Sequence, residues 1–143
     1  MYVQQDNAKP HPSSNDADVV HAVSLDGWRI QLYSQPPNSP DFNVLDLGFF
    51  NAIQSLQYKA APTTIDDLIR SVETAFHKLL KETLDNTFLT LQKCLECAML
   101  DGGGNSYALP HMGKAALRRT GTLPICIRCS QNAISTAKSF LPA

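Results

Sequence analysis

The distribution of proline restricts most strongly how this chain can fold. Most of the nine prolines fall into three stretches, residues 10–12, 36–40 and 110–124. Proline lacks the backbone N–H that helix interiors and central strands need, so regular elements end at these stretches. We therefore expect short elements rather than a bundle of long helices. The 143 residues and the 43% hydrophobic content are ordinary for one globular domain.

The N-terminal part of the chain predicts two strands with a helix between them. Residues 1–5 form a strand candidate that ends at the polar segment 6–11. Residues 13–18 offer N-cap side chains for a short helix, and Gly27 suits its C-terminal side. Residues 28–33 then alternate apolar and polar side chains, as a strand does. This order favours a crossover with parallel strands, although the pattern leaves antiparallel pairing open.

The remainder of the chain predicts a helix-rich C-terminal half. Four helical segments are expected: one from Val44 behind the cap Asn43, one over 65–80 behind the capping pair Thr64 and Asp67, one from Asp85 or Asn86 to the glycines 102–104, and a short one over 115–119.

Apolar side chains at helical spacing indicate which faces we expect in the core. The clearest series lies in residues 65–80, and we expect it, with the Phe49/Phe50 pair, to be core rather than a groove for a partner. The series comprises Ile65, Leu68, Ile69, Val72, Phe76, Leu79 and Leu80, and the next helix is expected to turn Phe88, Leu91, Leu95, Ala98 and Met99 inward.

Charge is distributed unevenly along the chain. Residues 1–101 hold all 13 acidic residues and seven basic ones, whereas residues 102–143 hold five basic residues and no acidic one. Within this cationic end, Lys114, Arg118 and Arg119 are candidates for contacts with DNA phosphates. A solvated, partly disordered end is the open alternative. No segment is long and apolar enough to predict a membrane span, so we expect a soluble intracellular protein without a membrane partner.

Two aspartates occupy positions that suit metal chemistry. Asp6 ends the first predicted strand and Asp46 lies in the first turn of a predicted helix, with residues 7–45 between them. Hard cations such as Mg²⁺ take carboxylate ligands, and two such ions can hold the attacking and leaving oxygens of a phosphodiester. The plainer interpretation is that Asp6 begins a turn and that Asp46 favours a helix N-terminus by its charge.

The sequence around both aspartates resembles mariner-type DNA transposases. Residues 4–11, QQDNAKPH, resemble the segment around the second catalytic aspartate of that family, and residues 35–50, QPPNSPDFNVLDLGFF, resemble the segment around the third. The length of the interval between Asp6 and Asp46 is typical of the plant-type branch of these mariner-like elements. Shorter segments, residues 85–92, 107–112 and 121–124, resemble the C-terminal region of the family, so the resemblance covers residues 2–124.

This resemblance implies a fold and an activity. It implies a truncated RNase H-like α/β fold that retains the late strands and C-terminal helices, in residues 1–124, followed by a divergent tail in residues 125–143. Asp6 and Asp46 would be catalytic and would hold two Mg²⁺ or Mn²⁺ ions for cutting and joining DNA. Transposon ends and target DNA would be the partners, the nucleus the location, and a homodimer is left open. Asn7 and His11 are lesser candidates for orienting a metal ligand or touching a phosphate.

The chain departs from the family pattern at its start. The family carries its first catalytic aspartate on an earlier strand, and five residues precede Asp6 here. We expect that this aspartate and the N-terminal helix-turn-helix region lie outside the chain, and that the chain alone is inactive. The alternative is a transposon-derived DNA-binding or protein-interaction module without the chemistry.

Four cysteines form two pairs that resemble zinc-ligand spacing. Cys94 and Cys97, and then Cys126 and Cys129, each enclose two residues. The first pair falls within a predicted helix, and the stretch 98–125 that separates the pairs is longer than the usual spacing. Ordinary thiols are therefore favoured over a structural zinc site.

Overall fold

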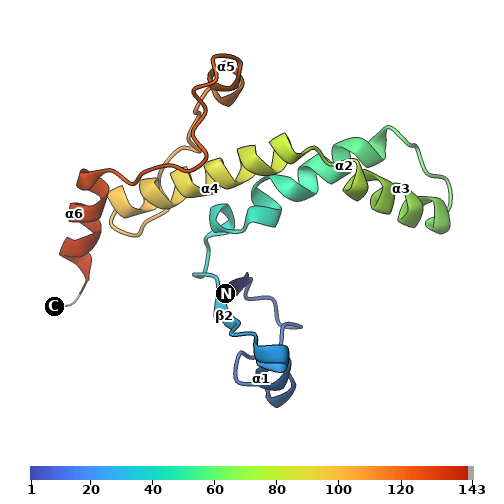
Figure 1. Cartoon of the computed structure of the whole chain (residues 1–143), viewed down its shortest axis with the longest axis horizontal. Helices are drawn as coiled ribbons and strands as arrows, with labels where there is room; N and C mark the ends of the chain where they lie inside the picture. Colours follow the sequence, from blue (N-terminus) through green and yellow to red (C-terminus); the bar gives the residue numbers. More distant parts are fainter. Residues whose placement is uncertain (142–143) are drawn as a thin grey trace. The chain divides into compact units, whose positions relative to one another are not determined.

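A computed structural model describes residues 1–141, which belong to two compact units divided between Ser39 and Pro40. The chain is a mixed α/β protein in which helices predominate and a parallel sheet is confined to the first unit (Figure 1). Among residues 1–141, no helix is long and apolar enough to cross a membrane. The boundary at residue 124, which followed from the resemblance, stays a prediction.

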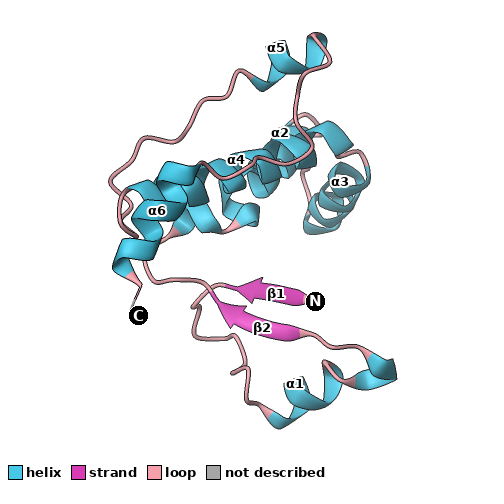
Figure 2. Cartoon of the chain, turned by 60° about the vertical axis from the view of Figure 1, so that its left-hand side comes forward, coloured by secondary structure: helices cyan, strands magenta, loops and turns pink. Residues whose placement is uncertain are grey.

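The first unit is a β–α–β crossover. Strand β1 (Tyr2–Gln5) pairs in parallel with β2 (Gln31–Ser34), and α1 (Ala17–Ala22) lies between them in the sequence (Figure 2). The predicted crossover and its parallel pairing are thus confirmed. Strand β2 begins three residues later than predicted, and a 3₁₀ turn, η1 (Leu25–Gly27), precedes it in the sequence. In that turn Asp26 and Gly27 adopt positive φ values of 53° and 77°, which suit glycine best.

The second unit is helical and centres on its longest helix, α4 (Lys81–Leu100). The 3₁₀ turn η2, the π-helical turn η3 and the last helix, α6, all contact α4, whereas α3 packs against α2 as a helical hairpin (Figure 1). The remaining elements are η2 (Pro40–Phe42), η3 (Leu45–Phe49), α2 (Phe50–Tyr58), α3 (Ile65–His77), α5 (Lys114–Arg119) and α6 (Gln131–Phe140).

Several helix starts follow their predicted caps. The Asn43 Oδ1 atom accepts a hydrogen bond from the Leu45 backbone N–H at 3.0 Å, and Thr64 Oγ1 accepts one from the Asp67 N–H at 3.1 Å. Such side-chain oxygens satisfy N–H groups that lack partners in the first turn. Helix α4 starts at Lys81, before the predicted Asp85 or Asn86, and its cap residue Leu80 makes no side-chain bond.

The core of the second unit follows α4, but the prediction of its inward face was partly wrong. Phe88 and Leu95, expected inside, are 49% and 43% exposed, although Ala98 is buried as expected. Because segments pack on more than one side of α4, its buried positions do not form a single apolar stripe. The buried residues of this helix are Thr87, Leu89, Cys94, Glu96 and Ala98.

The prediction that the α3 series is core is wrong. Ile65, Ile69 and Phe76 are 77%, 52% and 53% exposed. Helix α3 meets α2 through a neighbouring side, on which Ala75 is buried, and Phe76 touches Phe49 edge-on with ring centroids 6.2 Å apart. The small Ala75 allows close approach of the two helices, and the centre of the apolar stripe is left facing away from α2.

Candidate metal-binding and nucleic-acid-binding residues

Asp6 directly follows β1 and organises the turn after it. Its Oδ1 atom accepts a hydrogen bond from the Ala8 N–H at 2.8 Å and lies 2.8 Å from Nε2 of His11. The side chains of Asp6 and His11 are each 44% exposed. Asp6 therefore begins a turn, as the plainer interpretation expected, while its carboxylate stays accessible to solvent at the end of a strand. His11 approaches Asp6 itself, which fits a role in orienting that carboxylate.

Asn7 fastens the ends of the two strands together. Its side-chain amide donates to the Gln35 carbonyl oxygen at 2.6 Å, while the Gln35 N–H donates to the Gln5 carbonyl at 2.8 Å. Gln35 is 8% exposed, and its side chain donates to the Ser39 carbonyl. Asn7 and Gln35 thus hold the segment after β1 beside the segment after β2. Gln35 was not predicted, because nothing in the sequence pattern distinguishes a buried glutamine before two prolines from an exposed one.

Asp46 lies in the first turn of the helical segment that η3 opens, as predicted. Its Oδ2 atom accepts a hydrogen bond from the Asn43 side-chain amide at 2.7 Å, and the same Asn43 side chain caps Leu45. The Asp46 side chain is exposed. One asparagine therefore both starts this segment and orients the carboxylate.

The two aspartates belong to different units, so each site is described within its own unit. Oxygen donors from Asp6 and Asp46 are chemically suited to Mg²⁺ or Mn²⁺, and both carboxylates are accessible and already oriented by a neighbouring side chain. Within residues 1–141, no three or more His, Cys, Asp or Glu side chains gather as a metal-binding group. Asp6 and Asp46 are thus two separate, accessible carboxylates, each oriented by one neighbouring side chain.

Two of the three basic residues that are candidates for DNA contacts attach α5 to α4. Lys114 Nζ donates to the Asn86 carbonyl at 2.9 Å and to the Thr90 hydroxyl, and Arg118 Nη2 donates to Asn86 Oδ1 at 2.8 Å. Burial lowers the pKa of the Lys114 ammonium, since desolvation disfavours its charge. Arg119 is exposed and lines an open cavity of about 730 Å³ together with His111 and Lys114. Arg119 is therefore the residue of this set best suited to meet a phosphate.

A buried carboxylate that sequence analysis missed joins α4 to α6. Glu96, 6% exposed, accepts a hydrogen bond from Lys93 Nζ at 2.6 Å and another from the Ser130 N–H at 3.0 Å. Ser130 in turn caps α6, because its Oγ accepts from the Ala133 N–H at 3.2 Å. Glu96 and Ser130 are far apart in the sequence, so no local pattern predicts their contact.

All four cysteines are free thiols in quite different surroundings. Cys94 is fully buried, whereas Cys126 is exposed, and Cys129 Sγ lies 3.8 Å from the sulfur of Met99. Burial is the main cause that raises the pKa of the Cys94 thiol to about 11. The thiol of Cys94 thus behaves as an apolar core group.

No protein-family model, curated protein or solved structure matches the chain.

Proposed function

We propose that this chain is part of the catalytic domain of a mariner-like DNA transposase, with a truncated RNase H-like fold. In the parent activity, DNA strands are cut and joined with the help of divalent metal ions. The observation that carries the proposal is the pair of aspartates on the expected elements. Asp6 follows the first strand of a parallel β–α–β crossover, and Asp46 lies in the first turn of the helical segment after the second strand.

Each candidate residue has a distinct proposed role in binding metal or DNA. Asp6 and Asp46 would supply carboxylate oxygens to Mg²⁺ or Mn²⁺, which when bound stabilises the charge on the attacking and leaving oxygens of the phosphodiester. His11 restrains the Asp6 carboxylate, and Asn43 restrains that of Asp46. Arg119 would contact a DNA phosphate from α5. A nuclear location follows from this proposal.

The resemblance assigns two of the family's three catalytic aspartates to positions in this chain, Asp6 and Asp46. Fewer carboxylates give a weaker site for a hard cation. The chain alone should therefore bind metal weakly and leave a transposon-end duplex uncut in Mg²⁺. Robust nicking that depends on Asp46 would show that the two aspartates suffice and that the third is unnecessary.

Paramagnetic NMR with Mn²⁺ tests whether the two carboxylates share a metal site. We expect signals of residues around Asp6 and around Asp46 to broaden together as Mn²⁺ is added. Asp46→Asn should relieve the broadening at both segments, because removal of one ligand weakens a shared site. Asp66→Asn is the matched control, since Asp66 is likewise an exposed aspartate in the first turn of a helix. Broadening of the two segments at unrelated Mn²⁺ concentrations, each unaffected by the distant substitution, would overturn the proposal.

A further inference from the structure

An exposed apolar stripe runs along α3. Folded monomers rarely present so continuous an apolar surface without a partner for it. The stripe consists of Ile65, Leu68, Ile69, Val72 and Phe76, which are 77%, 39%, 52%, 37% and 53% exposed. At 100° per residue the five side chains fall on one side of the helix, which is about 20 Å long at 1.5 Å per residue.

Acidic and basic side chains alternate along one flank of this stripe. Asp66, Arg70, Glu73 and His77 are all exposed and follow one another at steps of four, three and four along the helix. This spacing keeps them on the same side of the helix, next to the apolar stripe. Their order is acid, base, acid, base. The reversed order is base, acid, base, acid, so the flank is complementary to an antiparallel copy of itself.

We propose that α3 is a self-association surface that pairs antiparallel with α3 of a second copy of this chain. In a two-fold symmetric interface the same patch is used by both copies, and each contact occurs twice. Antiparallel pairing about the middle of the helix brings the apolar stripes together. It also sets Asp66 opposite His77 of the second copy and Arg70 opposite Glu73 of the second copy.

The charge order favours a second copy over an unrelated apolar partner, because an unrelated partner requires no such self-complementarity. Arg70 is free to exchange partners: its bond to Asp67, at 2.7 Å, joins two exposed side chains, 72% and 41% accessible, and such pairs are weak. One pair of four-turn helices buries an area at the small end of specific interfaces. We therefore expect a reversible dimer whose population rises with protein concentration.

Sedimentation equilibrium of the full chain over a range of concentrations measures this association. Ile69→Asp places a charge in the middle of the stripe twice per dimer and should raise the dissociation constant about hundredfold. Either Arg70→Glu or Glu73→Arg places like charges opposite each other and should raise it about tenfold. The combined exchange, Arg70→Glu with Glu73→Arg, restores opposite charges and should recover most of the affinity.

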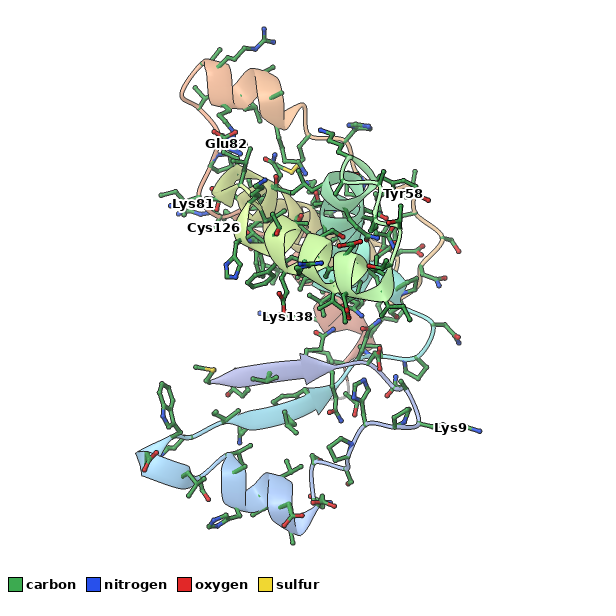
Figure 3. All side chains as sticks on the ribbon, turned by 90° about the vertical axis from the view of Figure 1, so that its right-hand side faces the viewer. Lys9, Tyr58, Lys81, Glu82, Cys126 and Lys138 are labelled. Atoms are coloured by element: carbon green, nitrogen blue, oxygen red, sulfur yellow. The ribbon has the colours of Figure 1, made fainter. Side chains whose placement is uncertain are left out.

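Lys138→Glu is the matched control, because it makes the same change in net charge as Arg70→Glu on the exposed surface of α6 (Figure 3). It should leave the dissociation constant unchanged. Circular dichroism checks that every variant keeps its helices.

Two outcomes would overturn the inference. The first is a protein that stays monomeric at all concentrations, whether the stripe is open to solvent or covered by another part of the same chain. The second is a dimer that weakens with each single charge reversal but does not recover in the combined exchange. Neither result bears on Mn²⁺ binding by Asp6 and Asp46, so the metal proposal and the self-association can fail separately.

Discussion

Helices α3 and α4 are neighbours in the sequence, and they differ in how their pattern relates to their burial. Helix α3 has the clearest apolar series in the chain and a side-chain cap from Thr64, yet the buried residue it contributes is Ala75. Helix α4 lacks a side-chain cap, yet five of its residues are buried. An amphipathic pattern thus shows which face a helix is able to bury. The face that it does bury depends on which other segments reach it.

Replacement of a leucine by alanine should give the largest difference in the free energy of unfolding between α4 and α3. Leu89 of α4 is 2% exposed and lines a cavity of about 380 Å³ with Leu123 and Pro124. Leu89→Ala should lower the free energy of unfolding by about 3 kcal/mol, through lost burial and a residual cavity. Leu68→Ala, at a 39% exposed position of α3, should cost less than about 1 kcal/mol. Urea unfolding at low protein concentration measures both, and equal losses would contradict the contrast.

Two ion pairs of the same i, i+3 spacing give the next largest contrast. The side chains of Lys93 and Glu96 in α4 are 37% and 7% exposed, and Glu96 also accepts a hydrogen bond from the Ser130 N–H. Glu96→Ala should cost about 2 kcal/mol, because the buried carboxylate's charged hydrogen bonds to Lys93 and the Ser130 N–H are lost. Arg70→Ala removes the exposed pair of α3 and should cost about 0.5 kcal/mol or less. Amide hydrogen exchange should show faster exchange in α6 for Glu96→Ala, while unchanged α6 protection would show that Glu96 does not hold this helix.

The same carboxylate makes the α6 contact sensitive to acid. The hydrogen bond from Lys93, and next that from the Ser130 side chain, hold the pKa of Glu96 below its usual range. A depressed folded-state pKa means that the stabilisation is complete above the unfolded-state pKa and is lost as pH falls through the folded-state pKa. Acidification below about pH 4.3, the ordinary pKa of glutamate, should therefore release α6 progressively. Glu96→Gln should be less stable at neutral pH and should lose less stability on acidification.

Loss of the α3 cap should have a smaller effect. Thr64 Oγ1 accepts from the Asp67 N–H, so Thr64→Ala leaves that donor without its side-chain partner. We expect a loss of about 1 kcal/mol, confined to α3. Carbon chemical shifts report helix content residue by residue, and they should change over 65–77 but not over 81–100. Thr64→Ser keeps the hydroxyl and should retain the wild-type shifts; a loss of helix in this control would show that the hydroxyl is not the cap.

Local signals were sufficient to predict much of the fold. Polar residues and prolines bound β1, β2 and α1, and caps such as Asn43 and Thr64 mark the starts of helical segments. Contacts between distant segments were not predictable. Helix α6 depends on a partly buried hydrogen bond between Ser130 and Glu96, and the exposure of the α3 stripe depends on α2 meeting Ala75. Burial of this kind is set by tertiary packing, which the periodicity of one segment does not contain.

The candidate site was predictable to a similar extent. The elements that carry Asp6 and Asp46 were predicted correctly, because strand ends and helix starts have local signatures. The contacts of the other candidate residues were not predicted. Nothing in the sequence indicated that Asn7 would donate a hydrogen bond to the Gln35 carbonyl, or that Lys114 and Arg118 would donate hydrogen bonds to Asn86. The charge of Lys114 and Arg118 was evident from the sequence, whereas their role in attaching α5 to α4 was not.

The rate at which cysteine thiols react compares the solvent accessibility of α4 and α3 directly, without a measurement of stability. The thiolate is the form that reacts with alkylating agents, and burial raises the pKa of Cys94 in α4 to about 11, so both burial and protonation protect it. Cys94 should react with iodoacetamide far more slowly than the exposed Cys126, at a rate set by opening of α4. A thiol introduced into α3 by Ile69→Cys should react at a rate close to that of Cys126 in dilute protein. The same introduced thiol should become protected as concentration rises if two copies pair through α3, whereas protection that is independent of concentration would mean that the stripe is covered within a single chain.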